Sequence, residues 1–171
     1  MMRLWRRIGV GVVLAAAIVP LLGVAKGAKR PLAPVDDFDP HVAGQVVILA
    51  AGKDFVALER EAKKLARTIK VPFSLRGMVY DKKNGLHYED GPGEGGYLFR
   101  RDSTMEIGGK ERHFISIEES AGYPGLKGGY YLIVADICFE PKEAARVVKR
   151  YRQVAPGAYA PRTAIYMGCM E

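Results

Sequence analysis

The sequence predicts an α+β fold, a four-stranded antiparallel sheet with two helices on one of its faces. Three observations predict it. Two short apolar runs, 44–51 and 130–135, leave no polar face and have the length of buried strands. An amphipathic helical pattern follows each of them. Two further segments, 73–80 and 158–167, carry proline at the start or inside, which suits edge strands.

The first run, 44–51, is Val-, Ile- and Ala-rich and leads into the turn 52–54. Asp54 is the expected N-cap of the helix that follows, and Val71-Pro72 ends that helix. Its apolar residues recur at spacings of three and four and so form one stripe: Phe55, Leu58, Ala62, Leu65 and Ile69.

The second unit repeats this plan. An aromatic and β-branched run, 130–135, reads as a strand. Pro141 suits the first position of the next helix because its missing N–H is not needed there. The helix is expected to stop at Pro156-Gly157. Its stripe is Ala144, Val147, Val148, Tyr151 and Ala155.

The two units align when the chain is shifted by 86 positions. Val46 then falls on Leu132, Leu58 on Ala144 and Phe73 on Tyr159. The pattern favours two strand–helix–strand halves, although two unrelated amphipathic units would also align. With right-handed crossovers, a βαββαβ chain gives a ferredoxin-like sheet of order 4-1-3-2. The two apolar runs would be its central strands.

The first 43 residues are predicted to lie outside this fold. Residues 1–25 combine Arg3, Arg6 and Arg7 with an apolar run and small residues at 23–25, which indicates a secretory signal peptide. A retained membrane anchor is the alternative. Residues 26–43 are proline- and aspartate-rich and read as a flexible tether. The domain is then 44–171, with an insert at 81–128.

The formal charge of the chain is +7, from 26 basic and 19 acidic residues. Removal of the signal peptide would take away three arginines and leave a mildly basic chain. The basic excess lies in the helical stretches 53–70 and 140–155. Such faces are usually just solvated, but they also attract anionic polymers or membrane surfaces. Nothing in the sequence indicates a nucleic-acid binder.

The cysteines are Cys138 and Cys169. Disulfides persist in an exported protein, and both residues would lie past the same end of the sheet. Their strand axes would be about 9.5 Å apart, two strand spacings, whereas a disulfide needs Cα atoms within about 7 Å. The sequence therefore leaves open whether they pair.

Both halves resemble the SPOR domain, the sporulation-related repeat of bacterial envelope proteins. The resemblance rests on QVVILAAGKDFVALEREA and GGYYLIVADICFEPKEAARVV and covers 45–80 and 129–167. It implies a non-catalytic domain that binds peptidoglycan glycan strands lacking stem peptides on the open sheet face. The usual polar sheet positions are apolar here, among them Ile48, Ala50 and Ile133. An apolar second face requires a cover.

The insert is the expected cover. Asn84-Gly85 is a hairpin turn signal, and the glycine-rich stretch 91–96 reads as a bend. Segments 97–99 and 113–118 are expected to be strands joined through Gly108-Gly109. We expect this insert to pack on the open face or to extend the sheet.

No catalytic, metal or cofactor site is predicted. His41, His87 and His113 lack the spacing of a metal motif. Glu118 and Glu119, as neighbours in a strand, would point to opposite faces and are expected to be solvated surface acids. Stretch 91–96 lacks the Lys-Ser/Thr of a phosphate loop.

Aromatic rings stack on sugars and guanidinium groups hold carboxylates, and muramic acid offers both partners. The predicted ligand-binding residues are Arg76, Tyr97, Arg100, Arg101, Tyr123 and Arg162. The alternative is that Tyr97 packs inside the insert and that Arg100 and Arg101 are a solvated pair.

Two functions follow as hypotheses for a periplasmic or secreted protein. One is a SPOR-like envelope protein that binds peptidoglycan or another anionic envelope glycan. The other is a protein-interaction module or inhibitor that uses the insert and the apolar sheet face. A small hydrolase has only scattered acids and histidines in its favour.

Overall fold

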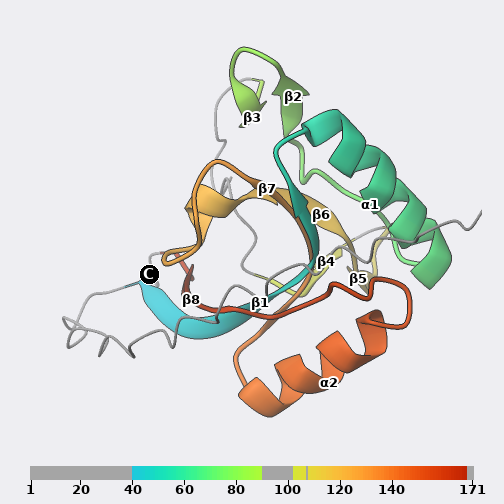
Figure 1. Ribbon diagram of the computed structural model, residues 1–171, viewed down its shortest axis with the longest axis vertical. Coiled ribbons are helices and arrows are strands. Elements are labelled where there is room, and N and C mark those ends of the chain that lie inside the picture. The colour runs from blue at the N-terminus through green and yellow to red at the C-terminus, as the bar shows by residue number, and fades with distance from the viewer. Residues whose placement is uncertain (1–39, 90–101, 107, 169–171) are drawn as a thin grey trace, which may run out of the picture. The chain divides into compact units, whose positions relative to one another are not determined.

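The computed structural model describes residues 40–89, 102–106 and 108–168. Its elements are β1 (His41–Gly52), α1 (Phe55–Ile69), β2 (Val79–Asp81), β3 (Gly85–His87), β4 (Thr104–Glu106), β5 (Glu111–His113), β6 (Ser116–Glu119), the 3₁₀ turn η1 (Ser120–Gly122), β7 (Tyr131–Cys138), α2 (Pro141–Tyr151) and β8 (Arg162–Tyr166) (Figure 1). The expected signal peptide and the tether as far as residue 39 lie outside the described residues.

Four strands form one antiparallel sheet in the order β6-β7-β1-β8. Strands β1 and β7 are central, as the two apolar runs predict, and both are longer than expected. Strand β1 begins at His41, three residues inside the predicted tether, because His41 to Ala43 pair with β8. Strand β8 follows Pro161 and lies at an edge. The predicted α+β class with a four-stranded antiparallel sheet is confirmed.

The predicted strand order is wrong at the other edge. Segment 73–80 does not join the sheet: Phe73 makes only an isolated parallel bridge to Ile115. Strand β6, which belongs to the insert, takes the place beside β7. The chain bends out of a strand at Arg76 and Gly77, whose φ angles are 55° and 80°. The structure therefore does not show the βαββαβ order 4-1-3-2.

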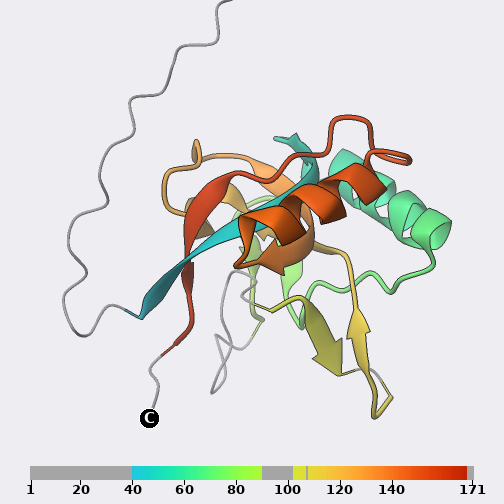
Figure 2. The same ribbon diagram turned by 90° about the horizontal axis from the view of Figure 1, so that it is seen from below.

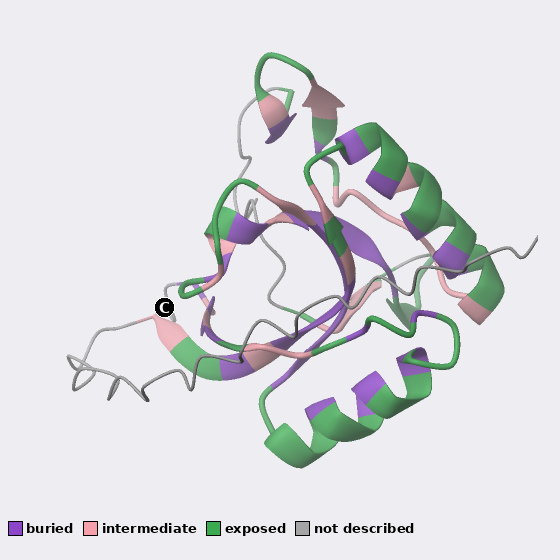
Figure 3. Cartoon of the chain, in the orientation of Figure 1, coloured by how far each residue is buried: buried purple, intermediate pink, exposed green. Residues whose placement is uncertain are grey.

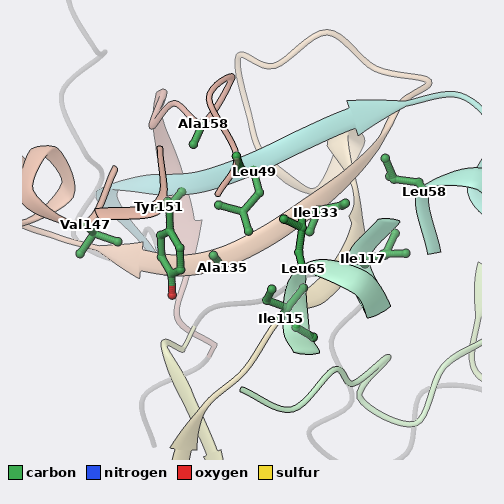
Figure 4. Packing of buried hydrophobic residues seen from close by; sticks show 14 of the residues in the cluster. Leu49, Leu58, Leu65, Ile115, Ile117, Ile133, Ala135, Val147, Tyr151 and Ala158 are labelled. Atoms are coloured by element: carbon green, nitrogen blue, oxygen red, sulfur yellow. The ribbon is translucent and has the colours of Figure 1, made fainter. Parts of the chain in front are cut away.

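Both helices lie on the same face of the sheet, as predicted (Figure 2). Asp54 caps α1, since its carboxylate accepts a hydrogen bond from the backbone N of Ala57 at 3.1 Å. Pro141 is the first residue of α2. The buried sides of the helices pack on Ile133 and Ala135 of β7 and Leu49 of β1 in the main core (Figure 4). At full burial, such aliphatic side chains contribute about 1.5–3 kcal/mol each.

The described residues between α1 and β6 include two hairpins. Strands β2 and β3 pair across the predicted Asn84-Gly85 turn. Strands β4 and β5 pair across the predicted Gly108-Gly109 turn, but the strands are Thr104–Glu106 and Glu111–His113. The expected strand 97–99 and the bend at 91–96 include no described residue.

Candidate functional site

The second face of the sheet, opposite the helices, is covered. Its core consists of Val46 and Ile48 of β1, Leu132, Val134 and Ile137 of β7, Ile165 of β8 and Tyr123 of the insert. Leu126 and Tyr130 pack against this cluster. The insert therefore both extends the sheet through β6 and lies over its second face, as expected. These apolar strand residues are buried and so are not exposed to contact a glycan.

A hydrogen bond ties this cover to the far edge of the sheet. The hydroxyl of Thr163 in β8 donates to the backbone O of Pro124 at 2.8 Å. The segment from Tyr123 to Leu126 therefore reaches from the β6 side across to β8. Tyr123 is only 1% exposed, so its ring lies inside the cover and not on the surface.

An ion pair anchors the insert at the opposite edge. Glu118 is fully buried, and Arg76 donates to both of its carboxylate oxygens, from Nε at 3.3 Å and from Nη2 at 3.0 Å. Paired guanidinium–carboxylate bonds of this kind fix geometry as well as charge. The expectation that Glu118 is a solvated surface acid is wrong, because β6 turns it toward the covered face.

The structure describes three of the six predicted ligand-binding residues, and it does not gather them on one open surface. Arg76 is engaged by Glu118, Tyr123 is buried, and Arg162 is exposed on the edge strand β8. Tyr97, Arg100 and Arg101 lie outside the described residues. A ligand-binding role for this set stays a prediction.

The outward sides of the two helices are exposed (Figure 3), and they carry the basic excess. Stretches 53–70 and 140–155 hold eleven basic residues against five acidic ones, and all eleven basic residues are exposed. They are Lys53, Arg60, Lys63, Lys64, Arg67, Lys70, Lys142, Arg146, Lys149, Arg150 and Arg152. We call the helical part of this surface, contributed by α1 and α2, the basic helical face.

Few of these charges are neutralised locally. Lys63 pairs with Glu59 at 2.8 Å, and Arg146 lies 3.7 Å from Glu143. Among the described residues, no carboxylate lies within ion-pair distance of Lys64, Arg67 or Lys149. Because both helices lie on one side of the sheet, their uncompensated charges add to one positive potential.

The sequence reasoning missed a smaller cationic feature at the end of the sheet. The Nζ atoms of Lys53 and Lys127 lie 5.4 and 5.8 Å from the ring centre of Tyr130. No signal in the sequence joins these residues, because Lys127 comes from the insert and Lys53 from the turn before α1.

The described acids and histidines are mostly engaged with the backbone or with single partners. Asp136 is buried and accepts a hydrogen bond from the N of Ile137, and its other oxygen lies 3.9 Å from Nδ1 of His113. The hydroxyl of Ser103 donates to the backbone O of Ile137 at 2.6 Å and is not directed at a histidine. Within the described residues, no three His, Cys, Asp or Glu side chains are placed to hold a metal ion.

Cys138 is buried, and burial followed by the nearby Asp136 carboxylate raises the pKa of its thiol to about 12. Its predicted partner, Cys169, lies outside the described residues, so the disulfide stays a prediction. No helix among the described residues has the length and apolar character needed to cross a membrane.

Comparison with models of known protein families gives no match, and neither do comparisons with curated proteins and with solved structures. The resemblance to the SPOR domain therefore stays a prediction drawn from the sequence.

Proposed function

We propose that this chain is a non-catalytic, exported envelope protein that binds an anionic envelope component, such as peptidoglycan glycan strands, through the basic helical face. One observation carries the proposal. The basic residues of the two helical stretches outnumber the acidic ones by eleven to five, all of the basic residues are exposed, and both helices lie on one side of the sheet.

Because the second face is covered, we place the binding surface on the helices and not on the sheet. A SPOR-like domain would present that face to the glycan, but here it is filled by its own core and by Tyr123. Among the described residues, the helical layer presents a large charged surface. Attraction between a cationic face and a polyanion acts over about one Debye length, roughly 8 Å at physiological salt.

The test is co-sedimentation of the full chain with purified sacculi, with and without stem peptides, at low and high salt. A variant with Lys64→Gln and Lys149→Gln removes two exposed charges from the two helices. Its matched control is Lys82→Gln with Arg112→Gln, two exposed bases of the insert hairpins.

Binding that weakens with salt, and weakens more in the helical variant than in the control, supports the proposal. The proposal is overturned if the wild-type chain stays in the supernatant with both kinds of sacculi, or if the two variants lose binding equally.

A second candidate is a protein-interaction module that adds a partner strand to β1. Strand β7 ends at Cys138, opposite Gln45, so Val42 to Gly44 pair with β8 and, within the described residues, with no strand on the other side. Val42 and Phe139 next to this edge are 47% and 42% exposed. An extended peptide with apolar residues at alternate positions fits such an edge. A Val42→Lys variant that keeps all its partners in an envelope pulldown would eliminate this candidate.

A further inference from the structure

Tyr130 lies just before β7, and two ammonium groups approach its ring. The Nζ atom of Lys53 lies 5.4 Å and that of Lys127 lies 5.8 Å from the ring centre.

Two hydrogen bonds hold the backbone of Tyr130. Its N donates to the hydroxyl of Ser120 at 3.1 Å, and its O accepts from the N of Ser120 at 2.9 Å. Ser120 itself is 1% exposed. The Tyr130 side chain is partly buried and packs against the second-face core. The two lysines therefore meet at a ring that its backbone and the core both restrain.

The two positive charges lack negative partners. Lys53 and Lys127 are exposed, and no described carboxylate lies within ion-pair distance of either. The distances to the shared ring centre keep their Nζ atoms within roughly 11 Å of each other, comparable with the Debye length. The ring stabilises each cation only weakly at an exposed site. Lysine has a long, flexible side chain with rotatable donors, so both exposed lysines can turn toward one anion bound beside the ring.

The side-chain types are compatible with phosphate. Lysine binds phosphate as a point charge, and a phosphate ester offers three strong acceptor oxygens, enough for two ammonium groups. Both cations here are lysines. The backbone between Lys127 and Tyr130 is not packed against other groups, because a Cβ placed on Gly128 or Gly129 would meet nothing within 4 Å.

We propose that Lys53, Lys127 and Tyr130 form a binding site for a phosphate ester, with the two ammonium groups on the phosphate oxygens and the tyrosine ring against the attached organic group. The ester belongs to a phospholipid headgroup or to a phosphate-bearing glycan. This site is separate from the pair Lys64 and Lys149 on the basic helical face, and it does not depend on the function proposed above.

The first experiment titrates the full chain with glycerol 3-phosphate and follows the backbone amide resonances of 128–131 by NMR. We expect saturable shifts confined to this region and to Lys53. Lys127→Gln should weaken binding about fivefold, since one close charge–charge contact is lost. Lys64→Gln, an equal charge change on α1, should weaken it less than twofold. Tyr130→Phe should retain binding, because the ring is kept.

Equal weakening by Lys127→Gln and Lys64→Gln would overturn the site, as would shifts spread over the whole surface. Acetate in place of glycerol 3-phosphate tests the class of anion, and equal affinity for acetate would overturn the assignment to phosphate.

The second experiment separates the two sources of the ester. Wild-type and Lys127→Gln chains are mixed with vesicles of phosphatidylcholine alone or with phosphatidylglycerol added, and the N-terminal apolar run contributes equally to both chains. A loss in Lys127→Gln specific to phosphatidylglycerol assigns the lipid headgroup. A loss seen only with a phosphate-bearing glycan assigns the glycan. If the helical variant loses sacculus binding while Lys127→Gln keeps it, the function proposed above stands without this site; the reverse pattern leaves the site and removes that function.

Discussion

Arg76 and Glu118 are 42 residues apart in the chain, and their side chains form two hydrogen bonds at the edge of the covered sheet face. The carboxylate is fully buried, while the arginine side chain keeps 17% of its surface exposed. Arg76 adopts a φ of 55°, in the left-handed region that a non-glycine residue rarely occupies. The pair therefore fixes the bend after segment 73–75 against the strand β6 that replaced it in the sheet.

Replacing Arg76 by Met should destabilise the protein by roughly 3–5 kcal/mol, because the buried carboxylate of Glu118 would lose the two hydrogen bonds from this guanidinium group. The free energy of unfolding in urea measures this change. Arg112→Met, at an exposed arginine of β5, is the matched control and should cost less than about 0.5 kcal/mol. Adding Glu118→Leu to Arg76→Met should recover part of the loss. Strictly additive losses would contradict a direct coupling between the two residues.

The thiol of Cys138 should be almost inert in the folded protein. Burial raises its pKa from 9.0 to about 12, so below pH 8 the reactive thiolate is about a thousandfold scarcer than for an ordinary cysteine. Alkylation by iodoacetamide in a Cys169→Ser chain, followed by mass spectrometry, should be slow in the folded state and fast in urea. Rapid labelling of the folded chain would contradict the buried position.

Gly44 lies where β1, β8 and the end of β7 meet. A Cβ there would stand 2.8 Å from Cγ1 of Ile165 and 3.4 Å from Cδ1 of Phe139. Gly44→Ala should therefore cost about 1–3 kcal/mol through overpacking. Gly128→Ala, whose Cβ meets nothing within 4 Å, is the control and should be close to neutral. Thermal unfolding of both variants checks the difference, and equal transition temperatures would refute it.

Tyr123 should contribute much of the stability of the segment that covers the second face. Its truncation to Ala removes a ring that is 1% exposed, and we expect a loss of about 3 kcal/mol or more. Tyr159→Ala, at a tyrosine that is 42% exposed, should cost clearly less. Urea denaturation compares the two, while binding of a hydrophobic dye reports whether the second face opens in Tyr123→Ala alone.

The β2–β3 turn should weaken in acid. The carboxylate of Asp81 accepts hydrogen bonds from the N of Lys83, the N of Asn84 and Nδ2 of Asn84. The bonds from Asn84 lead in holding the pKa of Asp81 below 3.8. A lowered pKa means that the stabilisation is fully present above about pH 3.8 and is lost as the pH falls through the folded-state pKa.

Amide resonances of 83–84, followed from about pH 5 to pH 2, test this turn. Asp81→Ala should show the loosened turn at every pH. Asp81→Asn should keep the two backbone bonds, which both go to Oδ1, and so keep most of the turn without the pH dependence. An acid transition that persists in Asp81→Asn would assign the titration to another group.

The parts of the fold that could be predicted are those whose pattern is local. Each of these patterns can be recognised within about fifteen residues of sequence: the apolar stripe of α1, its cap Asp54 and the two apolar strands. The choice of the second edge strand is not local. Segment 73–80 has the alternating apolar and polar residues of a strand, and the alternation in β6 is no stronger. What decides between them is the pairing of β6 with β7 and the buried contact from Glu118 back to Arg76.

The same reason limits the candidate site. A glutamate in a strand reads as a surface acid unless its partner is known, and the partner of Glu118 lies 42 positions earlier. Lys53 and Lys127 meet at Tyr130 only because the segment before β7 returns to the end of β1, where Gly52 pairs with Tyr131. By contrast, the basic excess of the two helices is visible in the sequence because it needs only the helical period.

Strands β1 and β8 run antiparallel with His41 opposite Tyr166, and the N of Met167 donates to the O of Pro40 at 2.8 Å. The two ends of the described domain therefore lie side by side. A pulling force applied to its two ends would open the β1–β8 pairs one after another, like a zipper, with each step opposed by only about 0.5–1.5 kcal/mol per hydrogen bond. The domain should therefore unfold at low force when it is pulled by its two ends. It should experience no such force when only one end is attached.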